Sequence, residues 1–215
     1  MTKITQKSFK DIPKSYDVNY QAGKVDFQFD KGKNFKSWRV VGNLYQMVKL
    51  YNLREVDELI FLDIDATERG RIQLSLIDEF ADECFVPLTV GGGVNKIQDI
   101  EDLLKVGADK VCINTAAIEN YKFLKDAVKK YGSQCIVVSI DYKLNKEKEL
   151  EVYKNSGNKK TGILLKDHFK KISELEPGEI ILTSIDHEGS MKGYDIKNIT
   201  KMNSISSSQI IASGG

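Results

Sequence analysis

The stretch ELIFLDID at residues 58–65 decides the expected fold, because it returns 121 residues later as EIILTSID at 179–186. A glycine-rich stretch follows each copy: VGGG at 90–93 after the first and ASGG at 212–215 after the second, 122 residues apart. Each copy begins with a short, continuous apolar run, which is typical of a strand buried on both faces of a parallel sheet. A half-structure that occurs twice in succession predicts a (β/α)8 TIM barrel built from two half-barrel repeats.

Apolar runs and amphipathic patterns alternate along the chain. Between the runs, apolar residues recur at helical spacing, as in Ile97, Ile100 and Leu104. Alternating strands and helices predict repeated βα units, an α/β fold class and a parallel sheet. By the repeat offset, the counterpart of the run at 110–114 falls beyond residue 215, so we expect a barrel truncated before its eighth strand. The expected strands cover residues 58–64, 86–90, 110–114, 135–141, 179–186 and 209–213.

The domain organisation is expected to be a single, incomplete barrel domain over residues 1–215. A chain of 215 residues with 41% hydrophobic residues can bury one substantial core. Residues 1–37 form an atypical N-terminal segment: DIPKSYDV is too polar for a buried strand, whereas KVDFQF at 24–29 alternates cleanly. The polar residues 143–161 are predicted to form a hairpin inserted into one βα loop.

Charge and cysteine content exclude several classes of partner. With 32 basic and 31 acidic residues the net charge is +1, so we expect neither a nucleic acid nor a membrane as partner. The first residues lack the apolar core of a signal peptide and no apolar run could span a bilayer, so a cytoplasmic location is expected. Cys84, Cys112 and Cys135 are odd in number and far apart, which favours reduced thiols over disulfides. No metal and no cofactor is expected.

The two glycine-rich turns each follow an expected buried strand. In a βα barrel the loops after the strands form the active face, and glycine allows backbone N–H groups to approach a phosphate closely. Glycine loops at matched positions therefore predict two phosphate sites. The alternative interpretation is that they are tight turns into the next helices.

Six stretches in the order of one family carry a more specific likeness: DELIFLDIDAT, PLTVGGGV, GADKVCINTAA, GSQCIVVSID, GEIILTSIDHEGSMKGYD and IIASGG. The chain resembles the cyclase subunit of imidazole glycerol phosphate synthase, a lyase of histidine biosynthesis. The resemblance implies a βα barrel that receives ammonia from a separate glutaminase subunit. It also implies a bisphosphate substrate, which is converted into imidazole glycerol phosphate and an aminoimidazole carboxamide ribonucleotide.

The resemblance also implies roles for individual residues. Asp141 matches the catalytic acid/base carboxylate of the fifth strand, and Glu188 stands where the family usually has a second catalytic Asp. A ring of alternating charge, through which ammonia passes at the bottom of the family's barrel, is matched by Glu58, Lys110 and Glu179. The phosphate contacts map to Gly92, Gly93, Asn114 and Thr115 in one half and to Gly189, Gly214 and Gly215 in the other.

One departure from the family keeps alternatives open. The first strand of the family supplies another catalytic Asp, whereas the only echo here is Asp17, displaced by one residue. Phrases such as FADECFVPLTVGGG also resemble a subgroup linked to bacterial surface-glycan synthesis, in which the barrel passes ammonia from a glutaminase to a sugar-modifying amidotransferase. The alternatives are therefore an ammonia-conducting subunit for sugar amidination, as in lipopolysaccharide biosynthesis, and a noncatalytic barrel fragment.

Overall fold

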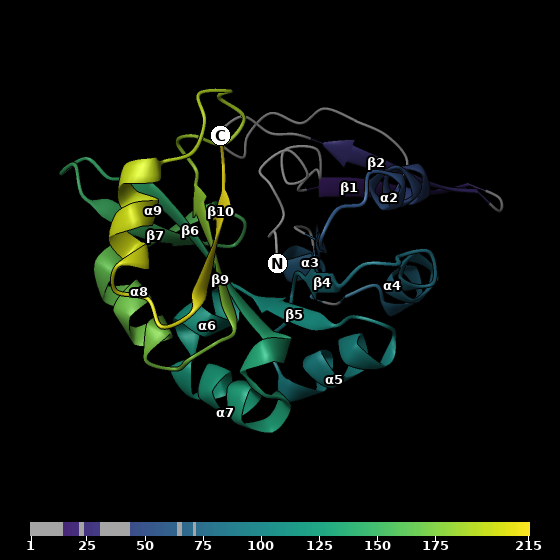
Figure 1. Ribbon diagram of the computed structural model, residues 1–215, viewed down its shortest axis with the longest axis horizontal. Helices are drawn as coiled ribbons and strands as arrows, with labels where there is room; N and C mark the ends of the chain where they lie inside the picture. The colour runs from purple at the N-terminus through teal and green to yellow at the C-terminus, as the bar shows by residue number, and fades with distance from the viewer. Residues whose placement is uncertain (1–14, 22–23, 31–43, 64–65, 71) are drawn as a thin grey trace.

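A curved parallel sheet with helices along its outer side forms the body of the protein (Figure 1). The computed structural model describes residues 15–21, 24–30, 44–63, 66–70 and 72–215. The sheet order is β10-β9-β6-β5-β4-β3, with every neighbouring pair parallel. The parallel strands are β3 (Leu59–Leu62), β4 (Leu88–Gly91), β5 (Lys110–Ile113), β6 (Ile136–Leu144), β9 (Glu179–Ser184) and β10 (Gln209–Ser213).

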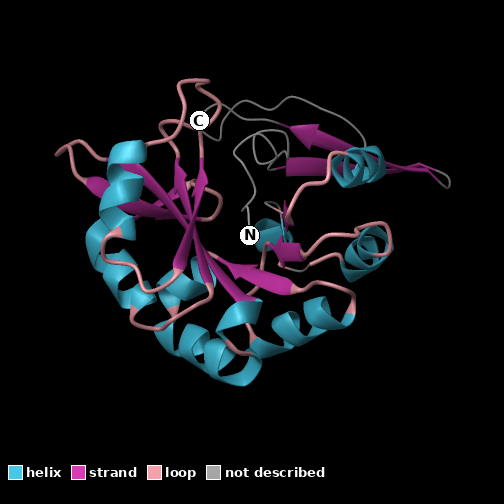
Figure 2. Ribbon diagram, in the orientation of Figure 1, coloured by secondary structure: helices cyan, strands magenta, loops and turns pink. Residues whose placement is uncertain are grey.

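The helices follow the strands in alternation, as Figure 2 shows. The longer ones are α2 (Leu44–Leu53), α4 (Leu74–Ala81), α5 (Ile97–Lys105), α7 (Tyr121–Tyr131), α8 (Leu165–Ser173) and α9 (Ile196–Asn203). The shorter ones are α3 (Ala66–Arg69), α6 (Thr115–Glu119) and the 3-10 turn η2 (Ser133–Cys135). The expected βα alternation is confirmed. Within the described part of the chain the free edges are β3 and β10, between which a closed (β/α)8 barrel would place its remaining strands.

Two hydrophobic clusters lie on the two faces of this sheet. Alternate residues of the strands, such as Phe61 and Val111, pack against the helices in the larger cluster. The residues between them form a small inner cluster of Ile60, Cys112, Val137, Ile181 and Ile211. The strands are buried on both faces, which explains why they read as continuous apolar runs in the sequence.

Two antiparallel hairpins accompany the parallel sheet. In the polar excursion after β6, β7 (Leu150–Lys154) pairs with β6 and with β8 (Lys159–Leu164). Near the N-terminus, β1 (Ser15–Gln21) pairs in the described residues only with β2 (Lys24–Asp30), which contacts α2. The described part of DIPKSYDV, residues 15–18, and KVDFQF therefore belong to an antiparallel hairpin, and Asp17 lies on β1 opposite Gln28. The rest of the atypical segment 1–37 lies outside the described residues.

The echoed glycines make the same close approach in both halves of the repeat. Gly92 has a φ of +116°, and a Cβ there would lie 2.0 Å from the backbone oxygen of Asp63. Gly214 has a φ of +90°, and its Cβ would lie 2.7 Å from the backbone oxygen of Ser184. Asp63 and Ser184 also occupy equivalent positions of the repeat: Asp63 directly follows β3, and Ser184 is the last residue of β9. Backbone packing is thus one reason for both glycines.

We predict that Gly92→Ala destabilises the fold by about 2 kcal/mol or more, because the new methyl group meets a backbone atom and φ is unfavourable for alanine. Gly162→Ala is the matched control: its φ is +74°, but no atom lies within 4 Å of the added Cβ. Urea unfolding of both variants separates the two effects. Equal losses would show that the contact with Asp63 contributes nothing beyond backbone strain.

A buried histidine joins two of the outer helices. His168 of α8 is completely buried, and its Nδ1 lies 2.8 Å from the hydroxyl oxygen of Tyr121 on α7. Burial, with a smaller contribution from Lys171, lowers the pKa of His168 from 6.5 to about 4. The imidazole is therefore neutral in the folded protein at physiological pH, and its role is packing.

This lowered pKa makes stability depend on pH. Between pH 6.5 and 4 the unfolded chain takes up the His168 proton before the folded chain does, so the free energy of unfolding falls as the pH drops. The expected loss reaches about 3 kcal/mol and is absent above pH 7. Denaturant unfolding from pH 8 to 4 measures it, with His168→Phe as the comparison. A wild-type and a variant curve of the same pH dependence would contradict the assignment.

Candidate active site

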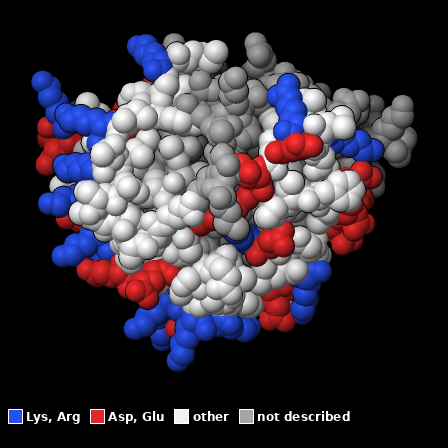
Figure 3. Space-filling model, in the orientation of Figure 1, with Lys and Arg blue, Asp and Glu red and all other residues white. Residues whose placement is uncertain are grey.

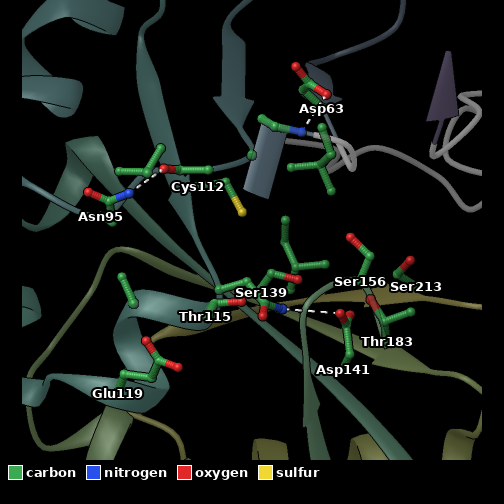
Figure 4. A pocket seen from close by; sticks show the side chains of 18 of the residues that line it. Asp63, Asn95, Cys112, Thr115, Glu119, Ser139, Asp141, Ser156, Thr183 and Ser213 are labelled. Atoms are coloured by element: carbon green, nitrogen blue, oxygen red, sulfur yellow. Dashed lines mark hydrogen bonds between the residues drawn. The ribbon is translucent and has the colours of Figure 1, made fainter. Parts of the chain in front are cut away.

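A cavity of about 220 Å³ opens at the C-terminal ends of the parallel strands (Figure 4). Asp63 directly follows β3, Asn114 directly follows β5, and Asp141 lies on β6. Thr183 of β9 and Ser213 of β10 complete this wall from the other half of the sheet. Polar side chains from several strands therefore converge at the end of the sheet where βα barrels carry their active sites.

The alternation of side chains along each strand places these polar groups. Cys112, in the inner cluster, is two residues before Asn114, and Ile181 is two residues before Thr183. Residues i and i+2 of a strand share one face. The polar wall residues are thus the continuation of the inner core toward solvent, and the cavity lies on top of that core.

Asp141 is the most enclosed of the predicted catalytic residues. The residue is only 7% exposed, and its Oδ2 accepts a hydrogen bond of 3.1 Å from Nδ2 of Asn114. This hydrogen bond fixes the position of the carboxylate in the cavity wall. Oδ1 of Asn114 is buried and has no hydrogen-bond partner among the described residues. A donor on a bound ligand would satisfy this oxygen.

The hairpin after β6 closes one side of the cavity. The backbone N–H of Asn155 donates to Oγ1 of Thr115 at 3.1 Å, and Ser156 lines the cavity beside it. Lys154 forms an ion pair with Glu119, which is another cavity residue. The hairpin turn is therefore attached to α6 at both ends of that short helix.

The structure brings together only part of the predicted site. Gly92, Gly93, Asn114, Thr115 and Asp141 all line the cavity. The residues of the other half do not: Glu188, Gly189, Gly214 and Gly215 lie outside its walls. Glu188 is beside Gly214, since a Cβ on that glycine would lie 3.4 Å from its Oε2. These residues form a second group at the β9–β10 side of the same face.

Sequence reasoning missed Asp63, a buried acid in the cavity wall. Its Oδ1 accepts a hydrogen bond of 3.0 Å from the N–H of Ala66, and its Oδ2 forms an ion pair with Arg69. The available signal was its position at the end of the first repeated strand, which matches Ser184 in the second. Ser139, Thr183 and Ser213 were also missed, although they stand within or at the end of the runs VVSID, ILTS and IIAS.

The predicted charged ring lies at the opposite end of the same strands. Nζ of Lys110 is 3.0 Å from a carboxylate oxygen of Glu58 and 3.0 Å from one of Glu179. The side chains are mostly buried, with exposed fractions of 17% for Lys110, 21% for Glu58 and 12% for Glu179. Burial lowers the pKa of Lys110, but the two hydrogen bonds to the carboxylates outweigh it, and the pKa stands above 10.5. From Lys110 to Asn114 the strand rises by about 13 Å.

Other kinds of site find little support in the described residues. No group of three His, Cys, Asp or Glu side chains is placed there to hold a metal ion, and the three cysteines are free. Basic and acidic side chains are interspersed around the rim of the molecule in Figure 3, without a large area of one sign. None of the helices described here has the length and apolar character needed to cross a membrane.

We predict that Lys110→Met lowers the free energy of unfolding by about 2 kcal/mol, because two partly buried carboxylates lose their common cation. This lies between the values typical of exposed and of fully buried ion pairs. Because the pKa of Lys110 is raised, the wild-type stabilisation is retained below pH 10.5 and is lost only as the pH rises further. Denaturant unfolding at pH 7 measures the loss.

The matched control is Lys105→Met, which removes an exposed lysine paired with Glu101 at 2.8 Å. Solvent screens that pair, so a much smaller loss is expected. Equal losses for the two variants would show that the ring contributes no more to stability than a surface ion pair.

Comparison with known proteins adds an independent finding. The family model described as "Histidine biosynthesis protein" matches residues 17–215. The imidazole glycerol phosphate synthase subunit HisF of Dictyoglomus thermophilum is 44% identical over 186 residues, which are 86% of this chain and 74% of that protein. The subunits of the same name from Clostridium botulinum and Bacillus cereus are 41% and 42% identical, with the same shares covered. These names support the resemblance to the cyclase subunit and give no support to the surface-glycan subgroup.

Proposed function

Because the chain belongs to the family of histidine biosynthesis proteins, we propose that it is the cyclase subunit of an imidazole glycerol phosphate synthase. In this role it forms imidazole glycerol phosphate and an aminoimidazole carboxamide ribonucleotide from a bisphosphate substrate, with ammonia supplied by a glutaminase subunit. The observation that carries the proposal is the enclosed Asp141, oriented by Asn114 in a cavity at the C-terminal ends of the strands. The proposed pathway places the protein in the cytoplasm.

Asp141 is the proposed general acid and base. Closing an imidazole ring requires protons to leave nitrogen and to reach oxygen, and a carboxylate fixed at the cavity wall can accept and return them. Asn114 holds the carboxylate by a 3.1 Å hydrogen bond. Glu188, in the neighbouring group after β9, is assigned the second acid/base role.

The two groups on the active face are assigned one phosphate each. Thr115 and Asn114 offer a hydroxyl and an amide in the cavity, next to the glycine turn at 92–93. Gly189, Gly214 and Gly215 offer backbone N–H groups beside Glu188. A substrate with a phosphate at each end would extend between the two groups and so pass Asp141.

The charged ring and the cavity define the proposed route of ammonia. Glu58, Lys110 and Glu179 lie at the starts of strands whose C-terminal ends line the cavity. Between the two levels stand the inner side chains Ile60, Cys112 and Ile181. Ammonia that passes the ring would meet these mostly apolar side chains on its way to Asp141. The similarity to HisF subunits favours this cyclase role over sugar amidination or a noncatalytic fragment.

Two substitutions separate chemistry from ammonia delivery. Asp141→Asn should lower the formation of imidazole glycerol phosphate by about 10²- to 10⁴-fold with either glutamine or free ammonium, because the acid/base group is lost. Lys110→Met should lower the glutamine-dependent rate and leave the ammonium-dependent rate close to wild type. Both rates are measured in the complex with a glutaminase subunit, by product formation from the bisphosphate substrate.

Asp126→Asn, an exposed change of the same type on α7, is the control and should leave both rates unchanged. Wild-type complex that converts no bisphosphate substrate, even with ammonium, would refute the cyclase assignment. An Asp141→Asn variant with full activity would refute the role of that carboxylate.

A further inference from the structure

The cavity proposed to accept an anionic substrate has an unexpected charge pattern. Its charged wall residues in the described chain are all acidic: Asp63, Glu119 and Asp141 (Figure 4). A carboxylate beside a phosphate repels it unless a cation compensates the charge. Cationic side chains that neighbour the wall residues can provide this compensation.

Cationic side chains pair with two of these acids. Arg69 pairs with Asp63, and Lys154 pairs with Glu119. Asp141 accepts a hydrogen bond from the amide of Asn114. The cations therefore come from α3 and from the end of β7, neither of which carried a predicted site residue.

Lys154 directly precedes Asn155, the hairpin residue that contacts Thr115 of the proposed phosphate site. Thr115 and Glu119 are four residues apart on α6, so their side chains share one side of that helix. The hairpin runs along this side, with Lys154 at Glu119 and the N–H of Asn155 at Thr115. The Lys154 side chain is only 18% exposed, whereas that of Glu119 is 54% exposed. The Lys154–Glu119 ion pair thus links the hairpin to α6.

We propose that Lys154 determines the anion specificity of this end of the cavity: it neutralises Glu119, so that no uncompensated carboxylate on α6 repels a phosphate group at Thr115. The assignment rests on the proposed phosphate site at Thr115 and extends it to the hairpin. The hairpin at 143–161, to which the sequence analysis assigned no role, then contributes electrostatically to substrate binding.

Titration of the full chain with inorganic phosphate, followed by the backbone amide NMR signals of residues 114–116, tests this role. Lys154→Gln should weaken phosphate binding by about two- to fivefold, the range of a partly exposed ion pair. Lys154→Arg should restore it, because the charge is kept. The double variant Lys154→Gln with Glu119→Gln should bind more tightly than Lys154→Gln alone, since the uncompensated carboxylate is gone.

Lys146→Gln is the matched control, because Lys146 is an exposed lysine of the same insertion, in the turn that precedes β7. Equal weakening by Lys146→Gln and Lys154→Gln would overturn the proposal, since net charge alone would explain both. Unchanged binding by Lys154→Gln would overturn it too, while weakening by Thr115→Val in the same titration would leave the phosphate site standing. A wild-type chain that shows no phosphate-dependent shifts would overturn the site at Thr115 and the Lys154 assignment together.

Discussion

Side chains alternate between the two faces of each strand, and this constraint couples the charged ring to the cavity. Along β5 the inner face presents Lys110, then Cys112, and then Asn114 just past its end. Along β9 it presents Glu179, Ile181 and Thr183. Each strand thus carries a charged start, an apolar middle and a polar end on one face. A shift of one residue in the pairing of either strand would remove all three groups from the interior.

The sequence was sufficient for the parallel part of the fold because its strands are buried on both faces. Continuous apolar runs such as 179–186 have no other place in a βα pattern, and the structure has β9 at Glu179–Ser184. The repeat offset also indicated that Gly92 and Gly214 are equivalent. The cause of this equivalence, the approach of the Asp63 and Ser184 backbone, joins residues 29 and 30 positions apart and has no local signature. The hairpin near the N-terminus was not predictable for a related reason: residues 15–21 pair with residues 24–30, and neither stretch has the apolar character that marks a barrel strand.

The candidate site divides in the same way between local and long-range information. Asn114 and Thr115 follow a buried strand and Asp141 lies within one, all inside motifs shared with a family, so these motifs predicted their place at one end of the sheet. Asp63 also lies within a family motif, but the resemblance assigned it no catalytic role, so it was not predicted as a site residue. The pairing of Lys154 with Glu119 depends on how a hairpin packs on a helix 35 residues earlier in the chain, and no spacing rule predicts such a contact.

The two repeats contribute unequally to the charged ring. Glu58 and Glu179 occupy equivalent positions 121 residues apart, yet both carboxylates rely on Lys110, which belongs to the first repeat. The halves match in backbone geometry but differ in their charge balance. If they were separated, the first would keep an acid with its cation, whereas the second would keep a mostly buried acid without this partner. The second repeat, although it resembles an independent unit, is electrostatically dependent on the first.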